Sequence, residues 1–145
     1  MHEQLKLENQ LCFRLYSATR LVTQAYRPLL EPLGLTYPKY LVMLVLWEHR
    51  KLTVGAIGEL LLLESNTLTP LLQRMEKDGF IIRTKGTTDS RQTLVELSHK
   101  GKLLESKAKD IPFCLTANWP KDSLPLEKLR TCASTLDGII DLLKK

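Results

Sequence analysis

The sequence predicts a mainly helical protein that contains one small β-hairpin. Apolar residues recur at three- and four-residue spacing over long stretches at both ends of the chain, as in amphipathic helices. Two runs rich in β-branched residues, 80–85 and 92–97, flank a polar tip and are typical of a hairpin. The 145 residues, of which 43% are apolar and 26% charged, suit one globular domain over residues 1–145.

The first helix is expected over about residues 5–33, with a bend at Pro28. Its length exceeds what a small core needs, so part of its apolar seam is expected to face a second subunit. The seam comprises Leu7, Leu11, Leu15, Ala18, Val22, Ala25 and Leu29.

The second helix is expected to begin at Thr36, as a cap, with Pro38 in its first turn. It runs through Trp47 and is apolar almost all round, which places it in the middle of the protein. Leu52 and Thr53 are expected to restart a short helix over residues 54–63. Its predicted inward residues are Ile57, Leu60 and Leu61.

The next helix, over about residues 64–79, has an unusual first turn, and Gly79 is expected to end it. It has more short polar side chains at its start than capping requires. One interpretation is an ordinary capped helix, and the other is a helix that enters the major groove of DNA. Its apolar stripe is Leu68, Leu71, Leu72 and Met75, and its candidate DNA contacts are Ser65, Asn66, Thr67, Thr69, Pro70, Gln73 and Arg74.

The hairpin favours the DNA interpretation. Two short helices joined by a tight turn have the order of a helix-turn-helix, and we call the second one the reading helix. A basic hairpin directly after the reading helix is the wing of a winged helix. The whole winged helix-turn-helix is predicted over about residues 36–97. Alone, Arg91 would be read as a surface arginine paired with Asp89, but in this order of elements Lys85, Asp89 and Arg91 become candidate DNA contacts.

The C-terminal part, about residues 98–143, is predicted to be helical and to help form a dimer. Ser98 caps its first helix, Pro112 bends or ends that helix, and Trp119 and Pro120 make a linker. The last helix has an apolar seam at heptad-like spacing, and together with the seam of the first helix it suits a dimer interface. A dimer would read the two half-sites of a pseudo-palindromic operator. This seam comprises Leu126, Leu129, Ala133, Leu136, Ile140 and Leu143.

Charge and composition narrow the function classes. The net charge of +5 and pI near 9.2 fit a polyanionic partner such as DNA. No apolar run approaches a membrane span, and the N-terminus lacks the apolar core of a signal peptide, so we expect a cytoplasmic protein without a membrane partner. The three histidines show no spacing typical of a metal site or a catalytic triad, and we expect no metal, no cofactor and no enzyme activity.

The chain has three cysteines, and an odd number in a protein expected in a reducing compartment argues against a disulfide framework. Cys12 lies one step off the first apolar seam, and from the residues alone a buried, inert thiol is the favoured interpretation. Cys132 lies beside the last seam and is expected in a core. All four tyrosines, at 16, 26, 37 and 40, fall in the first two helices, and Tyr16 lies one turn beyond Cys12. Tyr26 lies about 21 Å along a straight helix from Cys12, so only a partner's Tyr26 could reach that thiol.

The chain resembles the MarR family of winged-helix repressors over essentially its whole length, and most of all the OhrR branch, which responds to organic hydroperoxides. The resemblance lies in residues 7–13 (LENQLCF), 36–41 (TYPKYL), 46–49 (LWEH), 68–76 (LTPLLQRME) and 89–91 (DSR).

This resemblance implies that Cys12 senses organic hydroperoxide and that its oxidation releases operator DNA. Tyr26 and Tyr37 of the other subunit would donate hydrogen bonds to the thiolate, with Tyr16 nearby. Some members of the branch close a disulfide between the oxidised sensor and a second cysteine of the partner subunit. Cys114 is the candidate for this resolving thiol.

Three alternatives remain open. A related repressor could instead bind a small aromatic ligand in the dimer cleft, and would not need Cys12. A thiol-dependent enzyme lacks support from the residues around Cys12. A metal-responsive repressor ranks last, because the His and Cys residues do not cluster in the sequence.

Overall fold

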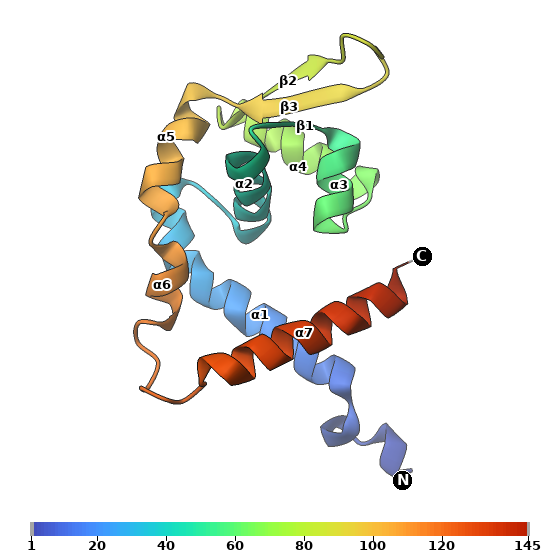
Figure 1. Cartoon of the computed structure of the whole chain (residues 1–145), viewed down its shortest axis with the longest axis vertical. Coiled ribbons are helices and arrows are strands. Elements are labelled where there is room, and N and C mark those ends of the chain that lie inside the picture. The colour runs from blue at the N-terminus through green and yellow to red at the C-terminus, as the bar shows by residue number, and fades with distance from the viewer. Residues whose placement is uncertain (1, 145) are drawn as a thin grey trace. The chain divides into compact units, whose positions relative to one another are not determined.

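Helices make up most of the chain, and a three-stranded antiparallel sheet completes it (Figure 1). The computed structural model describes residues 2–144 and divides into two units, Met1–Leu115 and Thr116–Lys145. The helices are α1 (Leu11–Leu30), α2 (Tyr37–His49), α3 (Val54–Leu61), α4 (Ser65–Lys77), α5 (His99–Ala108), α6 (Ile111–Thr116) and α7 (Leu126–Leu143), and the strands are β1 (Lys51–Thr53), β2 (Ile81–Lys85) and β3 (Thr93–Leu97).

The first helix is shorter than predicted. Two 3-10 turns, Glu3–Leu5 and Leu7–Asn9, precede α1, and a third, Glu31–Leu33, follows it. The side chains of Asn9 and Gln10 donate to the carbonyls of Glu3 and Gln4, at 2.8 and 2.6 Å. These bonds stabilise turns where a helix was expected. Pro28 does not end α1, which continues to Leu30.

Helix α2 is the central helix of the first unit, as predicted. Five of its side chains are buried, and Pro38 lies in its first turn. Thr36 occupies the N-cap position, but its side chain makes no capping hydrogen bond. The buried side chains are Tyr40, Val42, Met43, Leu46 and Trp47.

The segment after α2 differs from the prediction. Leu52 and Thr53 belong to strand β1, which pairs with β3 so that Leu52 faces Val95. This pairing depends on residues far along the chain and leaves no local signal. Thr53 does cap α3, because its hydroxyl accepts the amide hydrogen of Ala56 at 3.1 Å.

The expected burial in α3 is only partly correct. Ile57 is buried and Leu61 packs against the core, but Leu60 is 53% exposed. The buried positions of α3 are Ile57 and Gly58, and the C-cap residue Leu62 is 53% exposed like Leu60, so the buried face of this short helix is narrower than the predicted one.

Helix α4 and the hairpin confirm the predicted winged helix-turn-helix. Leu68, Leu71, Leu72 and Met75 are all buried. After α4, Gly79 adopts a φ of +80°, a left-handed conformation that suits glycine. Strands β2 and β3 pair antiparallel in the order β1-β3-β2, and Figure 1 shows their hairpin extending beyond the helices.

Ser98 caps α5 as predicted, because its hydroxyl accepts the amide hydrogen of Gly101 at 3.0 Å. The helix ends before Pro112, which lies inside α6, so the predicted break at Pro112 is wrong by a few residues. Proline is tolerated there because the amide groups of a helix's first turn need no partner within the helix.

The second unit consists of a linker and α7. No residue of α7 is buried, and the apolar side chains of its seam are exposed or half-buried. Within the described part of the chain, no single helix is long and apolar enough to cross a membrane. Taken together, Leu11–Leu33 and Tyr37–His49 are, but they are bent by 70°.

Candidate DNA interface and thiol site

The polar side chains at the start of α4 do not cap the helix. The N-cap position is Glu64, and no side chain makes a capping hydrogen bond there. Ser65, Asn66 and Thr67 are exposed, as are Pro70, Gln73 and Arg74, and Thr69 is half-buried. Their side chains lie outside the buried stripe, with Ser65 and Thr69 at its edge and the others on the solvent side of α4, so they can contact a ligand without disturbing the core.

The wing presents a cation held by its own neighbour. The Arg91 side chain is 91% exposed, and its Nε lies 3.2 Å from Asp89 Oδ1. The backbone amide of Arg91 donates to the same oxygen at 3.0 Å. These two donors, the backbone amide first, lower the pKa of Asp89 below its ordinary value. Asp89 therefore orients Arg91, and Lys85 is exposed at the end of β2.

Arg83 and Glu76 fasten the wing to α4, a pairing that the sequence analysis missed. Arg83 donates to Glu76 Oε2 from Nε at 3.0 Å and from Nη2 at 2.8 Å, and its backbone amide donates to Oε1 at 3.0 Å. The side-chain hydrogen bond, then the backbone one, lowers the pKa of Glu76. The strand position of Arg83, seven residues after Glu76, is a signal only once the hairpin register is known.

Three of the predicted DNA contacts of α4 and the wing meet at one concave surface. Ser65, Thr69 and Arg91 line a hollow of about 330 Å³ between α3, α4 and the hairpin, to which Arg83 of β2 and Thr93 of β3 also contribute. Hydroxyl groups and a guanidinium along a concave surface suit the phosphates of a DNA backbone.

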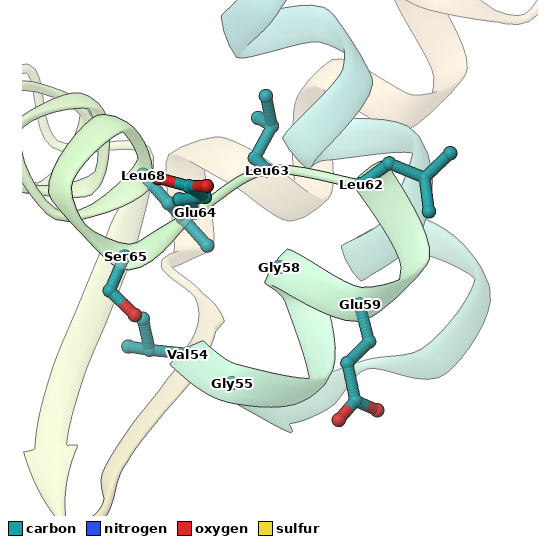
Figure 2. A pocket seen from close by; sticks show the side chains of 9 residues that line it. All are labelled: Val54, Gly55, Gly58, Glu59, Leu62, Leu63, Glu64, Ser65 and Leu68. Atoms are coloured by element: carbon teal, nitrogen blue, oxygen red, sulfur yellow. The ribbon is translucent and has the colours of Figure 1, made fainter. Parts of the chain in front are cut away.

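A second hollow, of about 490 Å³, marks the turn between α3 and α4, and Figure 2 shows Gly58, Leu63 and Ser65 among its lining residues. The two helices approach closely here. A Cβ atom on Gly58 would lie only 2.8 Å from the carbonyl oxygen of Leu63. Glycine at this position therefore allows the close approach between α3 and the turn that leads into α4.

Cys12 lies near the start of α1 and is exposed, so the expectation of a buried thiol is wrong for the single chain. The surrounding side chains of Leu11, Phe13 and Tyr16 are exposed as well. A thiol among exposed apolar residues is accessible both to a small oxidant and to a second protein surface.

Tyr26 and Tyr37 lie together, whereas Tyr16 lies apart from them and is 69% exposed. The ring centroids of Tyr26 and Tyr37 are 5.1 Å apart, and Tyr40 joins them at 5.8 and 6.3 Å. Burial, then the neighbouring Tyr37, raises the pKa of Tyr26, and burial with both neighbours raises the pKa of Tyr40. A raised pKa keeps the hydroxyls of Tyr26 and Tyr40 protonated, so both can donate hydrogen bonds. Tyr40, three residues after Tyr37, is the member that the sequence analysis did not assign.

The other two cysteines are also exposed. Cys114 lies on α6 and Cys132 on α7. The expectation that Cys132 belongs to a core is wrong for the single chain, because no residue of α7 is buried.

Comparisons with known proteins agree with this geometry. Residues 24–108 match the family described as transcriptional regulator SarA/Rot. The organic hydroperoxide resistance transcriptional regulator of Bacillus subtilis (strain 168) is 46% identical over 134 residues, which are 92% of this chain and 91% of that protein. The chain belongs to the MarR family of winged-helix transcriptional regulators, in its OhrR branch.

Solved structures support this assignment to the MarR family. Reduced AbfR bound to DNA is 34% identical and matches with a TM-score of 0.83, covering 98% of this chain and 97% of that one. Disulfide-formed AbfR is 37% identical, with a TM-score of 0.66 and 95% of both chains covered. AbfR is a protein of Staphylococcus epidermidis. The predicted family and fold are confirmed, and this MarR-family chain is a transcriptional regulator, not an enzyme.

Proposed function

We propose that this chain is a peroxide-sensing transcriptional repressor whose reduced homodimer binds operator DNA. The observation that carries the proposal is an exposed thiol, Cys12, on α1, the helix whose other end carries Tyr26. Tyr26 packs with Tyr37 and Tyr40 of α2 in what we call the tyrosine cluster, and the same chain carries the winged helix-turn-helix. Operator binding implies a location in the cytoplasm, where operator DNA lies.

The DNA contacts follow from the exposed face of α4 and from the wing. In a dimer, two reading helices about 34 Å apart would match two half-sites of a pseudo-palindrome. Residues of α4 would meet base edges or phosphates, and wing residues would reach phosphate or the minor groove. The α4 residues are Ser65, Asn66, Thr67, Thr69, Pro70, Gln73 and Arg74, and the wing residues are Lys85 and Arg91, with Asp89 taking part by orienting Arg91.

The redox step begins at Cys12. Its thiolate attacks the O–O bond of an organic hydroperoxide, an S–O bond forms, and an alcohol leaves, so sulfur is oxidised and the peroxide is reduced. Tyr26 and Tyr37 of the other subunit would stabilise the thiolate beforehand by donating hydrogen bonds, with Tyr16 nearby. The Cys114 thiol of the other subunit then attacks the sulfenic acid, and a disulfide forms with loss of water.

Structures of a relative favour the disulfide as the releasing event. AbfR has been solved bound to DNA in the reduced form and in the overoxidised form, and also in a disulfide form. The overoxidised form of that protein therefore still binds DNA. We assign release in this chain to the covalent link between subunits, which can shift the spacing of the two reading helices.

A second candidate is release by a small ligand. A hollow of about 480 Å³ lies between α1 and the start of α2, and Arg20, Arg27 and Tyr37 are among its lining residues. Two arginines beside a phenol could bind a small aromatic acid.

The test is fluorescence anisotropy of an operator fragment from the protein's own upstream region, titrated with an organic hydroperoxide. Wild type is expected to release DNA, whereas Cys12→Ser should stay bound and Cys114→Ser should lose most of its release. Near-complete release corresponds to a difference of about 5.5 kcal/mol between states. If Cys12→Ser releases DNA like wild type, the thiol mechanism is overturned and the ligand hypothesis takes its place.

A further inference from the structure

We infer that Lys39 and Asp78 are positioning residues that link the tyrosine cluster to the reading helix. The inference rests on the proposed function, because it concerns how a change at the tyrosines reaches α4. It assigns the transmission step to one ion pair between two helices.

The ion pair joins the start of α2 to the end of α4. Lys39 lies in the first turn of α2, between Tyr37 and Tyr40 of the tyrosine cluster. Its Nζ donates to Asp78 Oδ2 at 2.7 Å. Asp78 is the C-cap residue of α4, and its amide donates to the carbonyl of Arg74. One hydrogen bond therefore runs from the turn that carries the tyrosines to the end of the helix that reads DNA.

Lys39 is held more firmly than a surface lysine. Its side chain is only 15% exposed, so its four-carbon stem, which is flexible in a solvated lysine, is packed against the protein. A side chain confined in this way transmits a displacement of its backbone to its partner, whereas a solvated lysine would absorb it by rotating.

Asp78 needs cations at its position. A carboxylate at the C-terminus of a helix faces the negative end of the helix dipole and is unfavourable there without compensation. Lys39 supplies the direct partner. Lys100 donates to the backbone carbonyl of Asp78 at 2.7 Å, while its Nζ lies 4.3 Å from the centre of the Phe80 ring. The hydrogen bond from Lys39 is the main cause of the lowered pKa of Asp78, with Lys100 and Lys77 contributing.

The geometry gives the direction of coupling. A new bond at Cys12 that displaces Tyr26 and Tyr37 would move the first turn of α2, and Lys39 with it. The C-terminus of α4 would follow through Asp78. Apolar packing between α2 and α4 can slide, but a charge-assisted hydrogen bond has a narrow range of length and angle.

The experiment measures the release ratio, defined as the operator dissociation constant after hydroperoxide treatment divided by that of the reduced protein. Wild type is compared with Lys39→Met, Asp78→Asn and the double variant. Each single variant is expected to lower the ratio about five-fold, which equals about 1 kcal/mol. The double variant should lower it no further, because either change cuts the same link. The fraction of protein with the disulfide, measured by mass spectrometry, should not change.

Glu105→Gln is the matched control. Glu105 pairs with Arg50 at 2.9 Å, and this pair also joins an end of α2 to another helix, but far along α2 from the tyrosines. Its release ratio should equal that of wild type. Lys39→Gln, which keeps a hydrogen-bond donor, should retain a larger ratio than Lys39→Met, and it replaces Lys39→Met if that variant does not fold.

Two outcomes are distinguishable. If wild type does not release DNA on oxidation, the proposed function fails. If wild type releases DNA and the Lys39 and Asp78 variants do so equally, or if their effects add in the double variant, the link between tyrosines and reading helix is overturned.

Discussion

Arg83 and Glu76 illustrate how one residue pair can position neighbouring residues of a binding surface. Their three hydrogen bonds tie β2 to α4, and they use the charge of Arg83 within the protein. Arg91, at the far end of the hairpin, keeps an exposed guanidinium. The first arginine therefore sets the angle of the wing, and the second is available to DNA.

This pair has a definite pH dependence. The pKa of Glu76 lies below its ordinary value of 4.5. Its contribution to stability is complete above that value and is lost as the pH falls through the lowered pKa of the folded state. Glu76→Gln is expected to lower Tm by roughly 2 °C at neutral pH, since partly exposed ion pairs contribute modestly.

Thermal unfolding of wild type and Glu76→Gln, followed by circular dichroism from neutral to acidic pH, measures this difference. The two Tm values should converge only in the acidic range. A difference in Tm that is the same at every pH would mean that the charge of Glu76 does not contribute to its interaction with Arg83.

Residue roles were predictable where they depend on neighbours in the sequence. The pairing of Arg91 with Asp89, two residues away, was weighed from the sequence and is present. The pairs Glu76 with Arg83 and Lys39 with Asp78 depend on hairpin register and helix packing, which the sequence does not state. The exposure of Cys12 was not predictable either, because a thiol beside an apolar seam looks like a core residue.

At the scale of elements, the distance between α3 and α4 depends on Gly58. A methyl group there would meet the carbonyl oxygen of Leu63, which belongs to the backbone and cannot rotate away. Gly58→Ala is expected to lower the free energy of unfolding by about 2 kcal/mol, in the range typical of overpacking.

Gly55→Ala in the same helix is the matched control, because its new methyl group would have only the Thr53 hydroxyl near it, at 4.0 Å. Alanine favours helix over glycine, so this variant should be unchanged or more stable by about 0.5–1 kcal/mol. Urea denaturation measures both variants. Equal stabilities for Gly58→Ala and wild type would show that the two helices can separate without cost.

Elements with strong local patterns were predicted well. The apolar stripe of α4, the Ser98 cap and the hairpin all follow from residues within one or two turns of each other. Strand β1 has only three residues and exists through its pairing with β3. The start of α1 was misplaced because the side chains of Asn9 and Gln10 stabilise turns, which a count of apolar residues cannot reveal.

At the scale of the whole molecule, the apolar seam of α7 is the feature that a single chain does not explain. The helix has no buried residue, and Ile140 on its seam is 38% exposed. A dimer would bury such residues. Ile140→Lys is expected to weaken dimerisation about 100-fold, because a lysine charge would enter an apolar interface.

Leu142→Lys provides the comparison, since Leu142 is more exposed and lies on the opposite face of α7. Sedimentation velocity should give wild type and Leu142→Lys a mass twice the 16.6 kDa of one chain, and should show Ile140→Lys shifted towards the single chain. If both variants behave alike, the seam is not the dimer interface.

The start of α4 has a consequence for how such regulators change over time. In the part of the chain that the structure describes, the helix begins without a side-chain cap, and the contacts that fix it to the rest of the protein come from its buried stripe and from Glu76 and Asp78 near its end. Substitutions at Ser65, Asn66 or Thr67 therefore remove no capping bond and expose no apolar surface. If these positions contact operator DNA as proposed, the recognised operator sequence can change through them while the fold keeps its stability, so new target genes can be acquired without a loss of folded protein.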